Sequence, residues 1–236
     1  MQLSKLENLV YEKLKKNNIS IFRIKDLSLL MEISRTKAYN LVKAMKKKGV
    51  IKKVGKRAFA LRDTNEFVIA SSINYPSYIS FWSALSYYGF SDQMPKKIFL
   101  ATTKYTKDIN GFKYATLSKT RYFGYTKIDD TVIADKEKAI IDSLLFPKYA
   151  GGMKEIEKCL RAAINEINTE RLIEYALKMK SKAVLRRLGF VLEHLNYKSK
   201  IINKIIKKIG RGYELLDPNL RKKNNLNKRW LLDVNW

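Results

Sequence analysis

The sequence of 236 residues is nearly devoid of cysteine and histidine, with one of each, Cys159 and His194. A single cysteine cannot form an intramolecular disulfide, so a reducing cytosol is the expected compartment. The common zinc sites require clusters of cysteine and histidine and are therefore excluded. Both residues adjoin apolar stripes with helical spacing, and we expect structural roles for them.

The sequence also lacks the commonest phosphate-binding loops, since neither GxxxxGK[ST] nor GxGxxG occurs in it. The nearest approach to a magnesium site is the acidic stretch 129–142, whose members are better explained as turn, cap and helix-face residues. We therefore expect no metal, no cofactor and no catalytic site. An RNA-processing or nucleotidyl-transferring enzyme is disfavoured on the same grounds.

Long apolar runs are missing as well. No stretch of about eighteen apolar residues is present to cross a bilayer. Residues 1–5 do not resemble the start of a signal peptide, which would carry an apolar segment. We expect a cytoplasmic protein without membrane contact.

Acidic side chains are scarce, with 22 Asp and Glu against 48 Lys and Arg, a net charge of +26. The excess is uneven, because residues 1–62 carry +13, residues 63–180 carry +3 and residues 181–236 carry +10. A basic surface that served only solvation would be spread evenly along the chain. Two basic flanks instead indicate a nucleic-acid partner, since each neutralised phosphate releases counterions. Within the cytoplasm, this favours association with the nucleoid.

The strongest local pattern covers residues 34–49. Apolar residues recur at helical spacing from Ala38 to Met45, so one side of a helix can pack on a core. Ser34 stands where an N-cap belongs, and Gly49 where the helix must end. Most of the basic and polar residues fall on the opposite arc.

The neighbouring segments complete a DNA-binding motif. Residues 6–16 and 22–31 have helical apolar spacing, and residues 50–61 predict two short strands around a basic, glycine-containing turn. Helix, helix, basic helix and basic hairpin in this order predict a winged helix-turn-helix domain over residues 1–62. In such a domain the third helix enters the major groove of double-stranded DNA, and the hairpin, or wing, lies along a phosphate backbone.

The predicted DNA contacts are polar, basic and aromatic residues of the third helix and the wing. Those on or near the major groove are Ser34, Arg35, Thr36, Lys37, Tyr39, Asn40 and Lys43. Those of the wing, which hold phosphate or probe the minor groove, are Lys52, Lys53, Lys56 and Arg57.

The rest of the chain predicts two further parts. Residues 63–150 mix strand and helix patterns, including a helix over 78–89 capped by Ser77, and predict a small α+β domain. Residues 151–236 predict a basic helical region whose fourth apolar stripe spans 201–209. Its last part, 213–236, contains a candidate strand over 229–234. The predicted fold class is α+β, with an N-terminal winged helix-turn-helix, a small α+β domain and a helical C-terminal region.

Several segments keep the order and spacing of a known family. They are 78–90, 95–103, 122–125, 134–142 and 147–152. Through these segments and the N-terminal winged helix, to roughly residue 190, the chain resembles the AbiEi antitoxins of type IV toxin–antitoxin systems. The resemblance implies binding and repression of the chain's own operon promoter by the winged helix. It also implies neutralisation of a nucleotidyltransferase-like toxin, chiefly by the C-terminal part.

A protein of another class also fits the charge. An abundant architectural chromatin protein would coat DNA with little sequence preference and would need the same basic flanks. The sequence leaves this alternative open beside the expected sequence-specific regulator.

Overall fold

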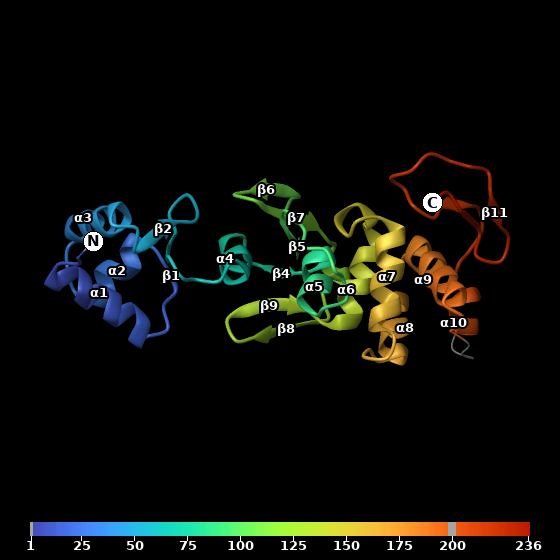
Figure 1. The fold of residues 1–236 in the computed structure, drawn as a ribbon, viewed down its shortest axis with the longest axis horizontal. Helices are drawn as coiled ribbons and strands as arrows, with labels where there is room; N and C mark the ends of the chain where they lie inside the picture. The colour runs from blue at the N-terminus through green and yellow to red at the C-terminus, as the bar shows by residue number, and fades with distance from the viewer. Residues whose placement is uncertain (1, 198–201) are drawn as a thin grey trace. The chain divides into compact units, whose positions relative to one another are not determined.

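The computed structural model describes residues 2–197 and 202–236, and the chain divides into two compact units, Met1–Tyr75 (unit 1) and Pro76–Trp236 (unit 2) (Figure 1). Both units combine helices and strands, in a mixed fold that agrees with the α+β class. None of the described helices is long and apolar enough to cross a membrane. The sequence predicts three domains, with boundaries after residues 62 and 150.

The first predicted boundary lies inside unit 1. Helix α4 (Glu66–Ile73) follows residue 62 and belongs to this unit. Its first residue, Glu66, forms an ion pair with Lys52. The compact unit therefore extends beyond residue 62, to Tyr75. A contact between two such segments leaves no periodic signal in the sequence.

The second predicted boundary lies inside unit 2. The helices that follow residue 150 pack on α6 (Lys136–Leu145). Arg187, from one of these helices, donates a 2.8 Å hydrogen bond to the carbonyl oxygen of Leu144. The middle and C-terminal parts therefore share one core and form a single unit.

Unit 1 combines helices with a small antiparallel sheet of strand order β1-β3-β2. Its elements are α1 (Lys5–Lys16), β1 (Ile21–Phe22), α2 (Ile24–Met31), α3 (Arg35–Lys47), β2 (Ile51–Lys53), β3 (Phe59–Leu61) and α4 (Glu66–Ile73). The core joins the apolar sides of α1, α2 and α3 to the sheet. Its buried members are Val10, Leu14, Phe22, Leu27, Met31, Ala38, Val42, Met45, Ile51 and Leu61.

Strand β1 corrects the prediction of a helix over residues 22–31. Phe22 pairs with Phe59 across the sheet, and their rings lie 6.3 Å apart. The helix begins only at Ile24, after Arg23 as N-cap, whose backbone N–H donates to the Asp26 carboxylate at 2.8 Å. A two-residue strand is too short for a period, so only its partner identifies it.

Both α1 and α3 begin with a side-chain cap. For α3 the sequence predicts this cap, and it also predicts the glycine that follows the helix. The Ser34 hydroxyl accepts a 3.2 Å hydrogen bond from the backbone N–H of Lys37. Gly49, with φ +72°, follows the C-cap residue Lys48. At α1, Ser4 and Glu7 cap each other reciprocally.

The Glu7 carboxylate predicts a measurable acid sensitivity. Its hydrogen bond with Lys48 and its bond with the Ser4 backbone lower its pKa from the usual 4.5. A carboxyl with a lowered folded-state pKa stabilises fully above its unfolded value and loses that effect as pH falls through the folded value. We expect Glu7→Gln to lower the thermal midpoint at neutral pH, with the difference from wild type shrinking below about pH 4.5. A difference that persists unchanged in acid would contradict this assignment, and Glu12→Gln, at an exposed site on the same helix, is the control.

Unit 2 has a six-stranded sheet, several helices and a small C-terminal sheet. Its strands and short 3₁₀ segments are β4 (Ser77–Ile79), β5 (Ile98–Thr102), β6 (Lys107–Ile109), β7 (Phe112–Thr116), η1 (Lys119–Arg121), β8 (Tyr125–Ile128), β9 (Thr131–Ala134), η2 (Pro147–Tyr149), β10 (Glu214–Leu215), β11 (Leu226–Asn227) and β12 (Leu232–Asp233). Its helices are α5 (Phe81–Tyr87), α6 (Lys136–Leu145), α7 (Met153–Ala163), α8 (Thr169–Lys178), α9 (Lys182–His194) and α10 (Ile202–Ile206).

The large sheet has the order β6-β7-β5-β4-β9-β8, with β4 antiparallel to β5 and parallel to β9. This central position of β4 corrects the predicted helix over 78–89. Tyr78 and Ile79 are fully buried in the sheet, and the helix starts at Phe81 with Ser80, not Ser77, at its N-cap. The aromatic residues that suggested a long helical stripe belong to a strand and a shorter helix.

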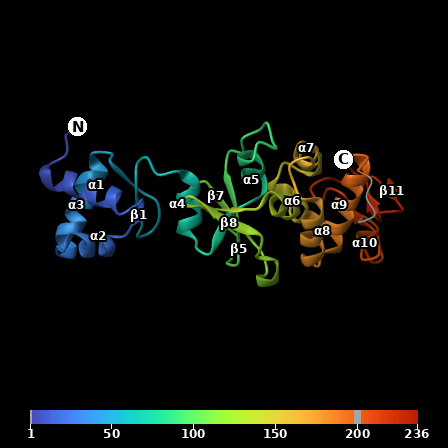
Figure 2. The ribbon, with the colours of Figure 1, turned by 90° about the horizontal axis from the view of Figure 1, so that it is seen from below.

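Helices α6, α8 and α9 lie side by side within unit 2 (Figure 2).

A buried polar cluster joins α6 to the sheet. Lys138 and Asp142 form an ion pair with both side chains fully buried. The other Asp142 oxygen accepts hydrogen bonds from Tyr78 at 2.9 Å and Ser80 at 2.8 Å.

The candidate strand over 229–234 agrees in part with the structure, since β12 (Leu232–Asp233) lies in this range. The segment after α10 is not helical, in contrast to the helical class given to residues 151–236 as a whole. It forms a small sheet of order β10-β12-β11. Trp230 is fully buried and packs where Gly189 of α9 has no side chain. The start of the predicted fourth stripe, Ile201, lies outside the described residues. Helix α10 contains Ile202, Ile205 and Ile206 of this stripe and ends before Ile209.

Candidate nucleic-acid interface

Helix α3 presents two chemically different sides. The residues on its core side are Ala38, Val42 and Met45. Thr36, Asn40 and Lys43 follow one another at intervals of four and three residues, so they form one stripe opposite the core side. α3 contains no acidic residue. Packing on the core thus fixes which polar groups face solvent.

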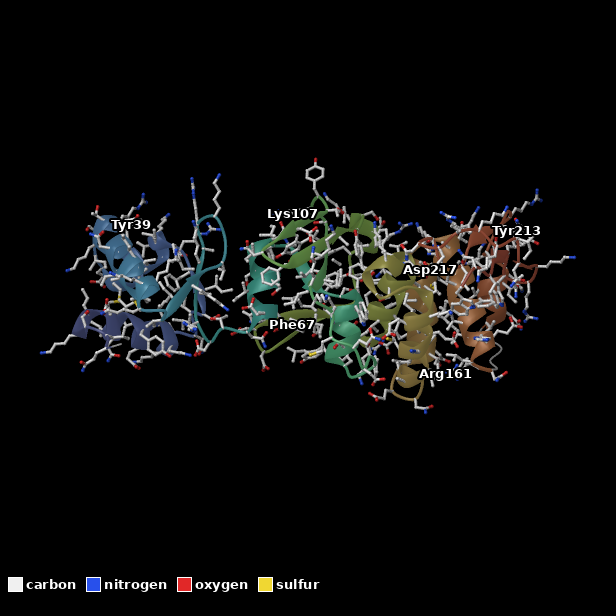
Figure 3. All side chains as sticks on the ribbon, turned by 45° about the horizontal axis from the view of Figure 1, so that its top comes forward. Tyr39, Phe67, Lys107, Arg161, Tyr213 and Asp217 are labelled. Carbon is white, nitrogen blue, oxygen red and sulfur yellow. The ribbon has the colours of Figure 1, made fainter. Side chains whose placement is uncertain are left out.

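All the residues predicted for this segment, from Ser34 to Lys43, are exposed. Tyr39, labelled in Figure 3, lies on α3 and is 53% exposed. Arg35 and Asn40 make no side-chain hydrogen bond or ion pair with the described residues. The Ser34 hydroxyl is already engaged as the cap of α3. Its main role is therefore to position the first turn of the helix.

The β2–β3 hairpin, residues 51–61, supplies the second group of predicted residues. Lys53, Lys56 and Arg57 are exposed, and none of them forms an ion pair with another described residue. Lys52 differs, because Glu66 of α4 neutralises its charge. This ion pair ties the hairpin to α4, and the phosphate contact of Lys52 stays a prediction.

The acidic side chains of unit 1 leave the charge of α3 and the tip of the hairpin uncompensated. Glu7, Asp63 and Glu66 pair with lysines outside α3 and outside the turn of the hairpin, namely Lys48, Lys15 and Lys52. On α3 and the hairpin, the cations without an ion pair among the described residues are Arg35, Lys37, Lys43, Lys46, Lys47, Lys53, Lys56 and Arg57. Such a set of unpaired cations attracts polyanions at long range.

Two residues of this surface were missing from the predicted contacts. Lys46 and Lys47 line a surface hollow of about 510 Å³ along α3, together with Asn40, Lys43 and Ala44. Lys47 continues the stripe of Thr36, because it lies one helical turn beyond Lys43. The helical period of the sequence is a signal that places Lys47 on this stripe. A run of lysines at the end of a helix usually contacts only solvent, so the run by itself does not indicate a DNA contact.

The single cysteine and the single histidine both contact neighbouring side chains of unit 2. Burial raises the pKa of the Cys159 thiol to about 12. His194 has its Nδ1 atom 3.0 Å from Glu157 Oε1, and its ring stacks on Phe190. Among the residues that the structure describes, no three His, Cys, Asp or Glu side chains are grouped to hold a metal ion.

Comparison with known proteins gives a likeness in fold. No family model and no curated protein sequence matches the chain. The structure is similar to the crystal structure of the RV2827C protein from Mycobacterium tuberculosis, with a TM-score of 0.72 and 13% sequence identity. The alignment covers 98% of this chain and 92% of that one. At this identity the likeness shows that the two chains share their fold over nearly the whole length.

Proposed function

We propose that the protein is a sequence-specific DNA-binding transcriptional regulator, and that unit 1 is a winged helix-turn-helix domain. The supporting observation is the polar side of α3, where exposed side chains lie opposite a buried apolar side. α2 and α3 form the helix-turn-helix, with the turn at Glu32 in the left-handed conformation. β2 and β3 are the wing.

In this proposal the two groups of side chains have different tasks. α3 is the recognition helix, and Arg35 and Asn40 read base edges in the major groove. An arginine can bond a guanine through two hydrogen bonds, and an asparagine an adenine. Lys53, Lys56 and Arg57 hold phosphates, which fixes the register of the protein without specifying sequence.

Substitution of the two groups tests this division. We expect Arg35→Ala or Asn40→Ala to cost roughly 1–3 kcal/mol at the preferred site and to relax its base preference. Lys53→Ala, Lys56→Ala or Arg57→Ala weakens binding to all DNA equally and reduces the salt slope by about 0.9 for each charge. Fluorescence titrations at several salt concentrations measure both quantities.

The control is Lys158→Ala, which removes one exposed charge from α7 of unit 2. It should leave both the base preference and the salt slope unchanged. Equal small losses of DNA affinity for the α3 and hairpin variants would contradict the division into residues that contact bases and residues that contact phosphates. The preferred site itself comes from footprinting the full chain on its own upstream region.

Repression of the chain's own promoter and neutralisation of a nucleotidyltransferase-like toxin extend this proposal. Both rest on the resemblance to AbiEi antitoxins described above. A nucleotidyltransferase-like gene beside this one would favour the toxin partner. Co-purification of the two proteins is its direct test.

A further inference from the structure

A cavity of about 490 Å³ lies within unit 1, beside the hairpin. Three segments line it: the start of α2 with β1, the turn of the hairpin, and the last turn of α4. The lining residues are Ile21, Phe22, Arg23, Asp26, Gly55, Lys56, Arg57, Ala58, Ser72 and Ile73. Its volume falls in the range of pockets that hold small organic ligands.

The cavity combines an apolar wall with a cationic rim. Ile21, Phe22, Ala58 and Ile73 supply the apolar surface. Among its polar residues are three cations and one carboxylate, that of Asp26, which already accepts the backbone N–H of Arg23. This composition favours a ligand with a negative charge and a flat apolar body.

The cationic rim is free to bind such a ligand. Arg23, Lys56 and Arg57 are exposed, and none has an ion-pair partner within the described part of the chain. Charge-assisted hydrogen bonds from these groups to a carboxylate are stronger than neutral ones. A DNA phosphate alone would leave the apolar wall uncovered.

We propose that this cavity binds a small organic anion with an apolar ring system, and that the bound anion weakens the binding of the hairpin to DNA. This second part rests on the proposed function. Lys56 and Arg57 belong both to the cavity and to the phosphate-holding residues of the hairpin. A guanidinium or ammonium that is paired with a bound carboxylate is no longer available to a phosphate, so the two ligands compete.

The turn of the hairpin and the end of α4 lie close together beside the cavity. A Cβ at Gly55 would lie 3.6 Å from Ala58 Cβ and 3.8 Å from Ile73 Cγ2. An occupant of the cavity thus touches the turn of the hairpin and the end of α4 together. The expected effect is a loss of about two phosphate contacts, which flattens the salt slope by about 1.8.

The first arm of the test measures binding without DNA. Naphthalene-2-carboxylate and its neutral isostere naphthalene-2-carboxamide are titrated into the full chain, with amide chemical shifts as the readout. We expect the carboxylate to shift Gly55, Ala58 and Ile73 at millimolar concentration and to bind at least tenfold more tightly than the carboxamide. Equal affinity for the two probes, or absence of shifts at these residues, overturns the site.

Two variants localise the binding. Ser72 is exposed, so Ser72→Trp should fill the cavity without disturbing the core, and should abolish carboxylate binding, while Ser72→Ala retains it. Arg23→Gln should lower carboxylate affinity about tenfold, the value of one charge-assisted hydrogen bond, and leave carboxamide affinity unchanged. Carboxylate binding that survives Ser72→Trp overturns the site.

The second arm measures DNA affinity with and without saturating naphthalene-2-carboxylate. We expect the probe to lower affinity and flatten the salt slope in wild type, and to have no effect on Ser72→Trp. Unchanged DNA affinity with the cavity occupied overturns the competition. If the protein does not bind DNA at all, the proposed function fails, whereas the first arm still decides whether the cavity takes an anion.

Discussion

Removal of unit 1 should abolish the preference for the chain's own upstream DNA and leave a weak, salt-sensitive affinity for any DNA. Unit 2 by itself, residues 76–236, still has 31 Lys and Arg against 16 Asp and Glu, a net charge of +15. Charge of this kind attracts phosphate without reading sequence. Specific binding exceeds non-specific binding by roughly a thousandfold or more at physiological salt, so the loss is large.

Competition titrations measure this loss, with the chain's own upstream fragment against a shuffled sequence of equal composition. The full chain provides the reference, and circular dichroism shows whether the isolated unit 2 is folded. If unit 2 keeps the preference, the reading residues are not on α3. If the full chain itself protects DNA uniformly, with no site occupied first, the architectural interpretation replaces the regulator.

Asp142→Ala should destabilise unit 2 by about 3–5 kcal/mol, because it leaves the Lys138 ammonium buried without a counter-charge. Burial lowers the pKa of Lys138, and the neighbouring Asp142 opposes this effect. The hydroxyls of Tyr78 and Ser80 lose their common acceptor as well. Denaturant unfolding, followed by a signal from unit 2, measures the change.

The double variant Lys138→Met with Asp142→Asn should cost less than Asp142→Ala alone. It removes both charges and keeps an oxygen that can accept from Tyr78 and Ser80. Lys158→Met, at an exposed position on α7, is the control and should change stability by less than about 0.5 kcal/mol. A loss below about 1 kcal/mol for Asp142→Ala would show that the cluster relaxes or admits water.

Local patterns predicted the parts of the fold that are fixed locally. The 3.6-residue period located α3, and Ser34 and Gly49 marked its ends, because caps act within a few residues. Strand β4 escaped prediction for the opposite reason. Ser77–Ile79 is strand only because β5 and β9 lie on either side of it, and its aromatic residue also fits a helix.

The candidate interface likewise combines features that local sequence determines with features that depend on distant parts of the chain. Which side of α3 is polar followed from the apolar spacing, so Thr36, Asn40 and Lys43 could be placed on one stripe from the sequence. Which lysines are neutralised could not be predicted, because Lys52 meets Glu66 only when α4 lies against the hairpin. The cavity beside the hairpin depends on that same placement of α4 and has no counterpart in any short motif.

The packing of Trp230 against Gly189 joins two parts of unit 2 that are synthesised at different times. Trp230 fills the space on α9, and the strand that follows it, β12, is the central strand of its sheet. A ribosome that has completed residue 189 must add some forty more before the indole exists, which takes about 2–8 s at usual rates of synthesis. Until then the chain lacks both the side chain that packs on Gly189 of α9 and the strand that pairs with β10, so unit 2 completes its packing only at the end of synthesis.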